Sequence, residues 1–242
     1  MKWKSLHDLD LPEVRALSYP NMDPRYSTQV LDELNSLGVE EIAFTDDGRP
    51  YFLGKGFRNV VLLVRVEEKP LAAKVRRDDW PHKEVWREVS VHKAANSLGI
   101  GPKLHGFARV VITMEVIEGA RLPEWVGEAS RDELISMMRS LMYQCRALDA
   151  ACIDHGELGD PSKHVIVSKG GTVVIIDFGS ARYSQRPKNF TSIASFLSRS
   201  GVKEAMQCAG LNPVVDVALL RRYKRTLSEE EFRAVLVSIG LE

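Results

Sequence analysis

The sequence has few cysteines and no pair of them at metal-ligand spacing. Three occur in 242 residues, Cys145, Cys152 and Cys208, and no CxxC motif is present. An odd number without close spacing argues against a disulfide framework and against a structural zinc site. No window approaches the roughly 20 consecutive apolar residues that a membrane-spanning helix requires, and no apolar segment of signal-peptide length follows Met1. We therefore expect a cytoplasmic protein with no membrane partner.

Positive and negative side chains balance in this chain. Lys+Arg and Asp+Glu each number 33, so the formal net charge is +0 at pH 7. A balanced chain has no overall field that would attract nucleic acid or a membrane surface. The basic cluster at 221–225 is therefore interpreted as the solvated end of a helix, and no nucleic-acid partner is predicted. Apolar residues at 44% and charged residues at 27% are typical of a globular protein.

The pattern of apolar residues predicts an α+β chain in three parts. Residues 1–38 are expected to form an N-terminal extension, irregular over its first 26 residues and then helical over 28–37. Residues 39–117 contain β-branched runs joined by short turns, which predicts an antiparallel sheet with one main helix near 83–98. Residues 118–242 are mostly helical with one hairpin. The expected strands of the sheet are 39–45, 59–66, 71–75, 104–107 and 110–116. The expected helices of the last part are 130–151, 191–197, 213–224 and 229–239.

The hairpin, expected at 164–167 and 172–176, brings several charged side chains together. The two ends of an antiparallel hairpin lie side by side, so residues before His164 must lie near residues after 176. Glu157, Asp160, His164 and Asp177 are therefore expected to converge at the hairpin mouth, with Lys163 among them. Carboxylates gathered beside a cation are the arrangement that binds a hard divalent metal and phosphate oxygens.

Six short motifs occur in an order that resembles one enzyme family. They are Gly54-Lys55-Gly56, Ala72-Ala73-Lys74, a helical Glu88, the segment from Met114 to Ile117, His155-Gly156-Glu157-Leu158 and Asp177-Phe178-Gly179. Between Leu53 and Arg182 this set resembles the protein-kinase superfamily. Within the superfamily it is most similar to the small atypical branch that includes the RIO kinases, the KEOPS-complex kinase and predicted archaeal Ser/Thr kinases. The resemblance implies a two-lobed fold, with an antiparallel-sheet N-lobe over 39–117 and a mostly helical C-lobe over 118–242.

The resemblance also implies roles for residues of the sheet-rich part. Lys74 would pair with the α and β phosphates of ATP, and Glu88 would hold Lys74. Glu84 competes for that second role, because it lies one helical turn earlier on the same face. The glycine-containing segment would let the backbone approach the phosphates. Its expected phosphate-binding residues are Gly54, Lys55 and Gly56, and the expected adenine-binding residues are Met114, Glu115 and Ile117.

The catalytic-loop motif departs from the family at two positions. Glu157 replaces the aspartate that orients the attacking hydroxyl, and His164 stands near the place of a metal-binding asparagine. Asp177 would bind the Mg²⁺ that bridges the phosphates, with His164 as a further ligand and Lys163 on the γ-phosphate. Imidazole is a poor ligand for Mg²⁺, so Mn²⁺ is the alternative metal. Phosphoryl transfer depends mainly on positioning and charge neutralisation, which the longer side chain of Glu157 can still supply.

These inferences predict an ATP-dependent phosphotransferase, most specifically an atypical serine/threonine protein kinase. Its acceptor would be a protein, including the chain itself. The prediction requires Lys74 and Asp177 to share one nucleotide triphosphate. Three alternatives remain open: a small-molecule or sugar kinase on the same fold, a catalytically weak ATP-binding pseudokinase, and an unrelated scaffold that contains Asp-Phe-Gly by chance.

Overall fold

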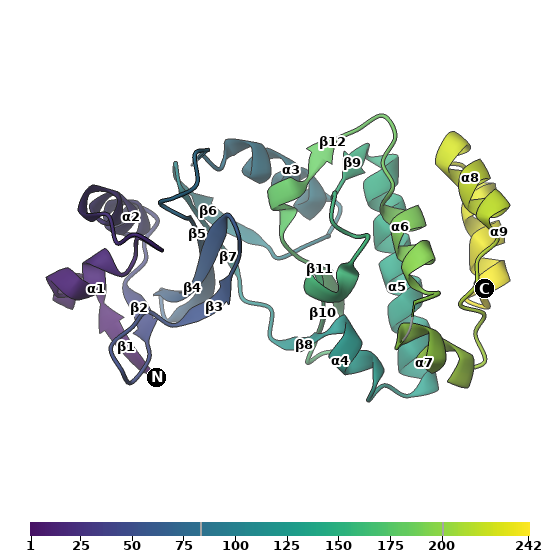
Figure 1. The fold of residues 1–242 in the computed structure, drawn as a ribbon, viewed down its shortest axis with the longest axis horizontal. Helices are drawn as coiled ribbons and strands as arrows, with labels where there is room; N and C mark the ends of the chain where they lie inside the picture. The colour runs from purple at the N-terminus through teal and green to yellow at the C-terminus, as the bar shows by residue number, and fades with distance from the viewer. Residues whose placement is uncertain (83, 200) are drawn as a thin grey trace. The chain divides into compact units, whose positions relative to one another are not determined.

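The computed structural model describes residues 1–82, 84–199 and 201–242 of the chain. In this part the chain is a mixed α+β protein with antiparallel sheets and nine α-helices (Figure 1). It divides into two compact units: unit 1 comprises Met1–Ser90 and Pro102–Val116, and unit 2 comprises Val91–Gly101 and Ile117–Glu242. Among the described residues, none of the helices combines the length and the apolar composition required to cross a membrane.

Unit 1 is built on a seven-stranded antiparallel sheet. The strand order is β1-β2-β4-β5-β7-β6, and β3 also pairs with β4. Its strands are β1 (Lys2–Ser5), β2 (Glu41–Phe44), β3 (Phe52–Lys55), β4 (Asn59–Val66), β5 (Lys69–Arg76), β6 (Leu104–Phe107) and β7 (Val111–Glu115). Strand β5 is central, since β4 and β7 flank it and both pair with it in an antiparallel register.

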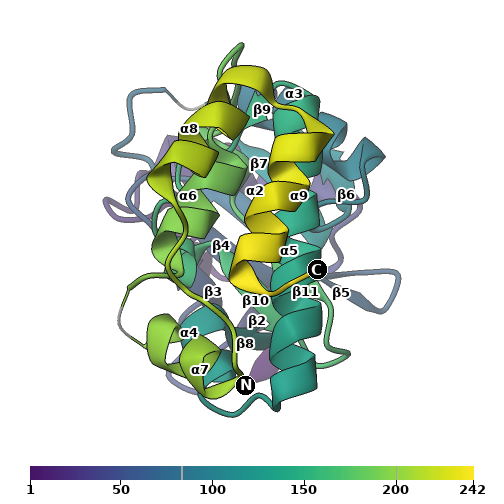
Figure 2. The same ribbon diagram turned by 90° about the vertical axis from the view of Figure 1, so that its right-hand side faces the viewer.

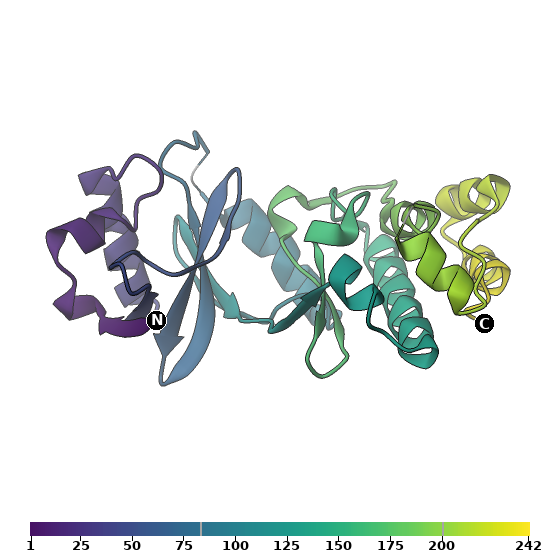
Figure 3. The ribbon, with the colours of Figure 1, turned by 60° about the horizontal axis from the view of Figure 1, so that its bottom comes forward.

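Two helices cover one face of this sheet, α1 (Leu11–Arg15) and α2 (Pro24–Ser36) (Figure 3). Asp23 caps the start of helix α2, and its side chain accepts a hydrogen bond from the backbone N–H of Tyr26. Its fully buried Val30 joins a cluster that includes Ala73 and Val75 of β5. Side chains alternate between the two faces of a strand. The residues between and after these two, Lys74 and Arg76, therefore face away from the helices.

Unit 2 is organised around helix α5 (Arg131–Ala150). A capping box of Ser130 and Glu133 starts this helix, and buried residues recur along it at the spacing of one helical face. Figure 2 shows α5, α6, α8 and α9 packed side by side. The helices of this unit are α4 (Leu122–Val126), α5, α6 (Asn189–Phe196), α7 (Val202–Cys208), α8 (Val217–Thr226), α9 (Glu229–Ile239) and the later residues of α3 (Trp86–Ser97).

Short strands form the remainder of unit 2. A three-stranded sheet has the order β11-β10-β8, and a separate two-stranded ladder joins β12 to β9. These strands are β8 (Gly119–Arg121), β9 (Ile153–Asp154), β10 (Val165–Ser168), β11 (Val173–Ile175) and β12 (Arg182–Tyr183). The expected hairpin is thus present as β10–β11, and it extends into a third strand that the sequence pattern did not indicate.

The expectation that the first 26 residues are irregular is wrong. They contain β1, which pairs with β2 along its whole length, and the short helix α1. Pro12 and Pro24 suggested irregular backbone, but they lie in the first turns of α1 and α2, where a missing N–H costs nothing. Helices α4 and α7 were also not predicted, because five and seven residues are too few to show a helical period.

Candidate functional site

Lys74 is a buried cation at the centre of the sheet. Its backbone lies opposite Val61 of β4 and Ile112 of β7, and the residue is only 5% exposed. A charged group at such a position requires a compensating charge. The Nζ atom of Lys74 lies 2.5 Å from Oε1 of Glu88, which is itself 3% exposed. Burial and pairing hold this ammonium in one place.

The two candidate glutamates have different partners. Glu88 lies on the first turn of α3 and contacts Lys74 through one carboxylate oxygen and Arg76 through the other. The Oε2 atom of Glu88 is 3.0 Å from the Nη2 atom of Arg76. Glu84 instead forms an exposed ion pair of 3.5 Å with Arg109. Exposed pairs of this kind contribute at most about 1 kcal/mol. Among the described residues, Glu88 is thus the carboxylate that Lys74 contacts in unit 1.

The glycine-containing segment lies at the end of β3. Gly54 and Lys55 belong to the strand, and the backbone N–H of Gly56 donates to the carbonyl of Asn59 at 2.8 Å. The ammonium of Lys55 lies 4.3 Å from the ring centroid of Phe52 and 5.0 Å from that of Tyr19. This cation is therefore held against aromatic rings within unit 1.

The residues expected to bind adenine lie at and after the end of β7. Met114 pairs with Ala72 of β5 and packs against a small apolar cluster. Glu115 is already engaged through its backbone, because its N–H donates to the carbonyl of Lys103 at 2.9 Å. Ile117 is the first residue of the chain's second stretch in unit 2, so the three residues are divided between the two units.

Two ladders bring distant segments together at the hairpin mouth. In β10–β11, Val165 pairs with Ile175, and the N–H of Ile176 donates to the carbonyl of His164 at 2.9 Å. In β9–β12, Arg182 lies opposite Asp154, and their side chains form an ion pair of 2.6 Å. The loop after β9 and the loop after β11 are consequently held side by side, since each connects the same two ladders.

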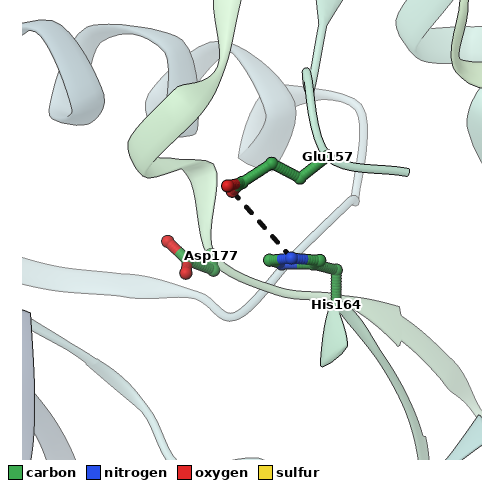
Figure 4. A group of neighbouring side chains, drawn as sticks. All are labelled: Glu157, His164 and Asp177. Carbon is green, nitrogen blue, oxygen red and sulfur yellow. Dashed lines mark ion pairs between the residues drawn. The ribbon is translucent and has the colours of Figure 1, made fainter. Parts of the chain in front are cut away.

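Glu157, His164 and Asp177 gather between these ladders (Figure 4). One ligand atom from each residue lies within 4.8 Å of the others. The Nε2 atom of His164 is 3.9 Å from Oε2 of Glu157, and both residues are half-buried. Nδ1 of His164 is buried and has no hydrogen-bond partner among the described residues. The prediction that these three side chains converge is therefore met by the geometry.

Asp177 has an unusual backbone conformation for a residue with a side chain. Its φ of 66° lies in the left-handed region, and its Oδ1 accepts a hydrogen bond from the N–H of Gly179 at 3.2 Å. Aspartate tolerates this region better than most residues, but the conformation still stores strain. Strained residues are frequent at functional sites, where the surrounding structure holds them. Here the two ladders fix the carboxylate at the hairpin mouth.

Two other predicted members have contacts of their own. Asp160 accepts a hydrogen bond of 2.5 Å from Ser162, and this bond is the main reason why the pKa of Asp160 lies below its ordinary value. Lys163 is exposed at the end of a short 3₁₀ turn, and its carbonyl accepts a hydrogen bond from Arg121 at 2.8 Å. The expectation that Asp160 belongs to the cluster is not met, because the turn directs it to its own neighbour.

A buried polar network supports the loop that carries Glu157. The side chain of Asn189 donates to Asp149 at 2.7 Å and to the carbonyl of Ile153 at 2.6 Å, and it accepts from the N–H of His155 at 2.9 Å. Asp149 also accepts from the Tyr223 hydroxyl at 2.9 Å. Burial raises the pKa of Asp149 above its ordinary value, although these hydrogen bonds oppose the rise.

Sequence reasoning missed Arg76 and this network. Arg76 follows Lys74 by two residues on a strand, so period-two alternation was a signal that both cations share one face. The network had no comparable signal, because Asp149, Asn189 and Tyr223 are far apart in the sequence and meet only through helix packing.

Comparison with known proteins supplies no relative for this chain, since no family model and no curated protein matches it.

Proposed function

We propose that this chain is an ATP-dependent phosphotransferase of the protein-kinase type, with a serine or threonine hydroxyl of a protein as the acceptor. The observation that carries the proposal is the gathering of Glu157, His164 and Asp177 at one hairpin mouth. The ordered motifs between Leu53 and Arg182 support it as a resemblance. The buried pair of Lys74 and Glu88 supports it independently, as a fixed cation suited to phosphate oxygens.

The hairpin-mouth residues fit a divalent cation. A Mg²⁺ ion about 2.1 Å from its ligands places neighbouring ligand atoms about 3 Å apart and opposite ones about 4 Å apart. The separations here are all within 4.8 Å, with 3.9 Å between Glu157 and His164, so side-chain movements of less than about 1 Å would suffice. Glu157 and Asp177 would supply the oxygen ligands. His164 would be the weaker ligand, since its other ring nitrogen has no acceptor among the described residues.

The roles of the chain's own residues follow from their chemistry. Glu157 would accept a hydrogen bond from the acceptor hydroxyl and orient it toward the γ-phosphate. Lys74 would donate to phosphate oxygens while Glu88 limits its movement. A cation bound by Asp177 would neutralise charge on the phosphate chain. The two-lobed arrangement, in which Lys74 and Asp177 share one nucleotide, is part of this proposal.

A transfer assay with ATP labelled on the γ-phosphate tests the proposal. Wild type should label an added protein acceptor or itself, and Lys74→Ala, Asp177→Asn and Glu157→Gln should each reduce labelling by about 100-fold or more. Asp160→Asn is the matched control, because it removes a nearby carboxylate that points to Ser162 and lies outside the cluster. It should retain labelling within a few-fold.

Two results would contradict the proposal. Equal labelling by wild type and all variants would show that the named residues take no part in transfer. Nucleotide binding without any transfer would favour the pseudokinase alternative, and labelling of sugars or other small molecules in place of protein would favour the small-molecule kinase.

The choice of metal has a test of its own. Because imidazole suits Mn²⁺ better than Mg²⁺, the wild type should bind Mn²⁺ more tightly than Mg²⁺ in the presence of nucleotide, as measured by titration calorimetry. His164→Asn substitutes an amide oxygen and should reduce that preference. An unchanged preference would exclude His164 from the ligands.

A further inference from the structure

The face of β5 that is turned away from α1 and α2 carries two buried cations. Lys74 and Arg76 are 5% and 6% exposed, whereas Ala73 and Val75 on the opposite face belong to the apolar cluster of unit 1. One carboxylate, that of Glu88, contacts both cations, with 2.5 Å from Oε1 to Lys74 and 3.0 Å from Oε2 to Arg76. Each oxygen of this carboxylate therefore has a cation beside it: Lys74 donates a hydrogen bond to Oε1, and Arg76 forms an ion pair with Oε2.

Arg76 is itself held at both its backbone and its side chain. Its N–H donates to the carbonyl of Val110 at 3.0 Å, and its carbonyl accepts from the Tyr26 hydroxyl at 2.8 Å. Its Nη1 donates to Oδ1 of Asn59 at 2.7 Å. The backbone carbonyl of Asn59 accepts a hydrogen bond from the N–H of Gly56. The side chain of Arg76 therefore connects Glu88 to the base of the glycine-containing turn.

We propose that Arg76 is a positioning residue that retains Glu88 when Lys74 turns toward a phosphate. The inference deepens the proposed function and rests on it. A buried carboxylate that loses its only cation is strongly disfavoured. If Glu88 had Lys74 alone, moving the ammonium onto phosphate oxygens would leave such a carboxylate behind. Arg76 keeps one oxygen of Glu88 paired throughout, so Lys74 is available to the nucleotide at a smaller cost.

Nucleotide affinity is the quantity that this role controls. Arg76→Met keeps an unbranched apolar stem of similar reach but removes the cation. It should weaken binding of ATP with Mg²⁺ or Mn²⁺ about tenfold or more, because the buried Glu88 would lose one of its two cations. Arg76→Lys restores a cation without the planar fork and should recover part of the affinity. The dissociation constants are measured by titration calorimetry on the full chain.

A control on the same strand separates positioning from stability. Val75→Ala removes apolar contact on the opposite face, so it should lower the melting temperature while leaving the dissociation constant for ATP unchanged. If Arg76→Met behaves like Val75→Ala, with lower stability and unchanged affinity, the positioning role is refuted and Arg76 is merely structural.

A second variant covers the case in which Arg76→Met does not fold. Asn59→Ala frees Nη1 of Arg76 but leaves its contact with Glu88, so a several-fold loss of affinity is expected. Unchanged affinity would refute the connection to the glycine-containing turn. Failure of the wild type to bind ATP with either metal would overturn the proposed function together with this inference. If the wild type binds ATP and both Arg76→Met and Asn59→Ala bind it with the same dissociation constant, the inference alone is overturned.

Discussion

Asn189→Ala is the substitution expected to expose most directly what supports the hairpin-mouth loop. Asn189 is 1% exposed, and its side chain makes three hydrogen bonds, to Asp149, to the carbonyl of Ile153 and from the N–H of His155. Alanine leaves two buried backbone groups without their partners, and each such group costs about 1–3 kcal/mol. Asp149 retains three other donors, so its share of the loss is smaller.

We expect the free energy of unfolding to fall by about 3–5 kcal/mol, since bonds made by one side chain do not add independently. Urea denaturation followed by circular dichroism measures this loss. Hydrogen exchange of the His155 amide measures its local part, and that amide should exchange faster in the variant. The prediction links stability to the site, because the same loop carries Glu157 two residues later.

A matched control exists in the same unit. Asn212 also donates to a carbonyl, that of Ser238 at 3.1 Å, and accepts from an amide, that of Val214 at 3.0 Å, but it is exposed. Water can replace those bonds, so Asn212→Ala should cost less than about 1 kcal/mol. A loss below about 1 kcal/mol for Asn189→Ala as well would show that burial does not decide the cost, and the reasoning would fail.

Three further predictions concern other positions. Asp149 has a raised pKa in the folded state, so its contribution to stability is largest in acid and falls as the pH rises above its ordinary value of about 4. The difference in unfolding free energy between wild type and Asp149→Asn should therefore decrease from pH 4 upward, and an increase would show that the hydrogen bonds dominate. Asp78→Ala removes the acceptor that anchors residues 18–23, costs about 2 kcal/mol and should create a new proteolytic site there, whereas unchanged digestion would contradict the anchoring role. Gly101→Ala combines a φ of +85° with a new Cβ 2.6 Å from the Phe178 ring, so it should lower the free energy of unfolding by about 3 kcal/mol. Gly210→Ala strains only the backbone and should cost about 1 kcal/mol in the same thermal measurement. Equal losses for the two variants would show that the Phe178 ring moves aside.

Local sequence signals predicted the elements that their own residues determine. The long helix α5 could be located from the capping box at Ser130 and its apolar spacing, and the hairpin from two β-branched runs around Gly170 and Gly171. Hairpin geometry also predicted that His164 and Asp177 would be neighbours, because antiparallel pairing determines which residues meet. These inferences needed no contact between distant parts of the chain.

Only the tertiary structure decided which charged groups meet when their segments are distant in sequence. The sequence predicted Glu88 as the partner of Lys74 but left Glu84 as a competitor, and the docking of α3 beside β5 selected Glu88. The same docking placed a second cation, Arg76, beside Glu88. The energetic effect of this ion pair depends on how deeply it is buried, and the sequence of one strand does not determine that burial. The sequence by itself therefore determined local elements and the pairing of adjacent strands. The partners of buried charges were decided by packing, because the cost of an unpaired charge depends on how far the whole fold removes it from water.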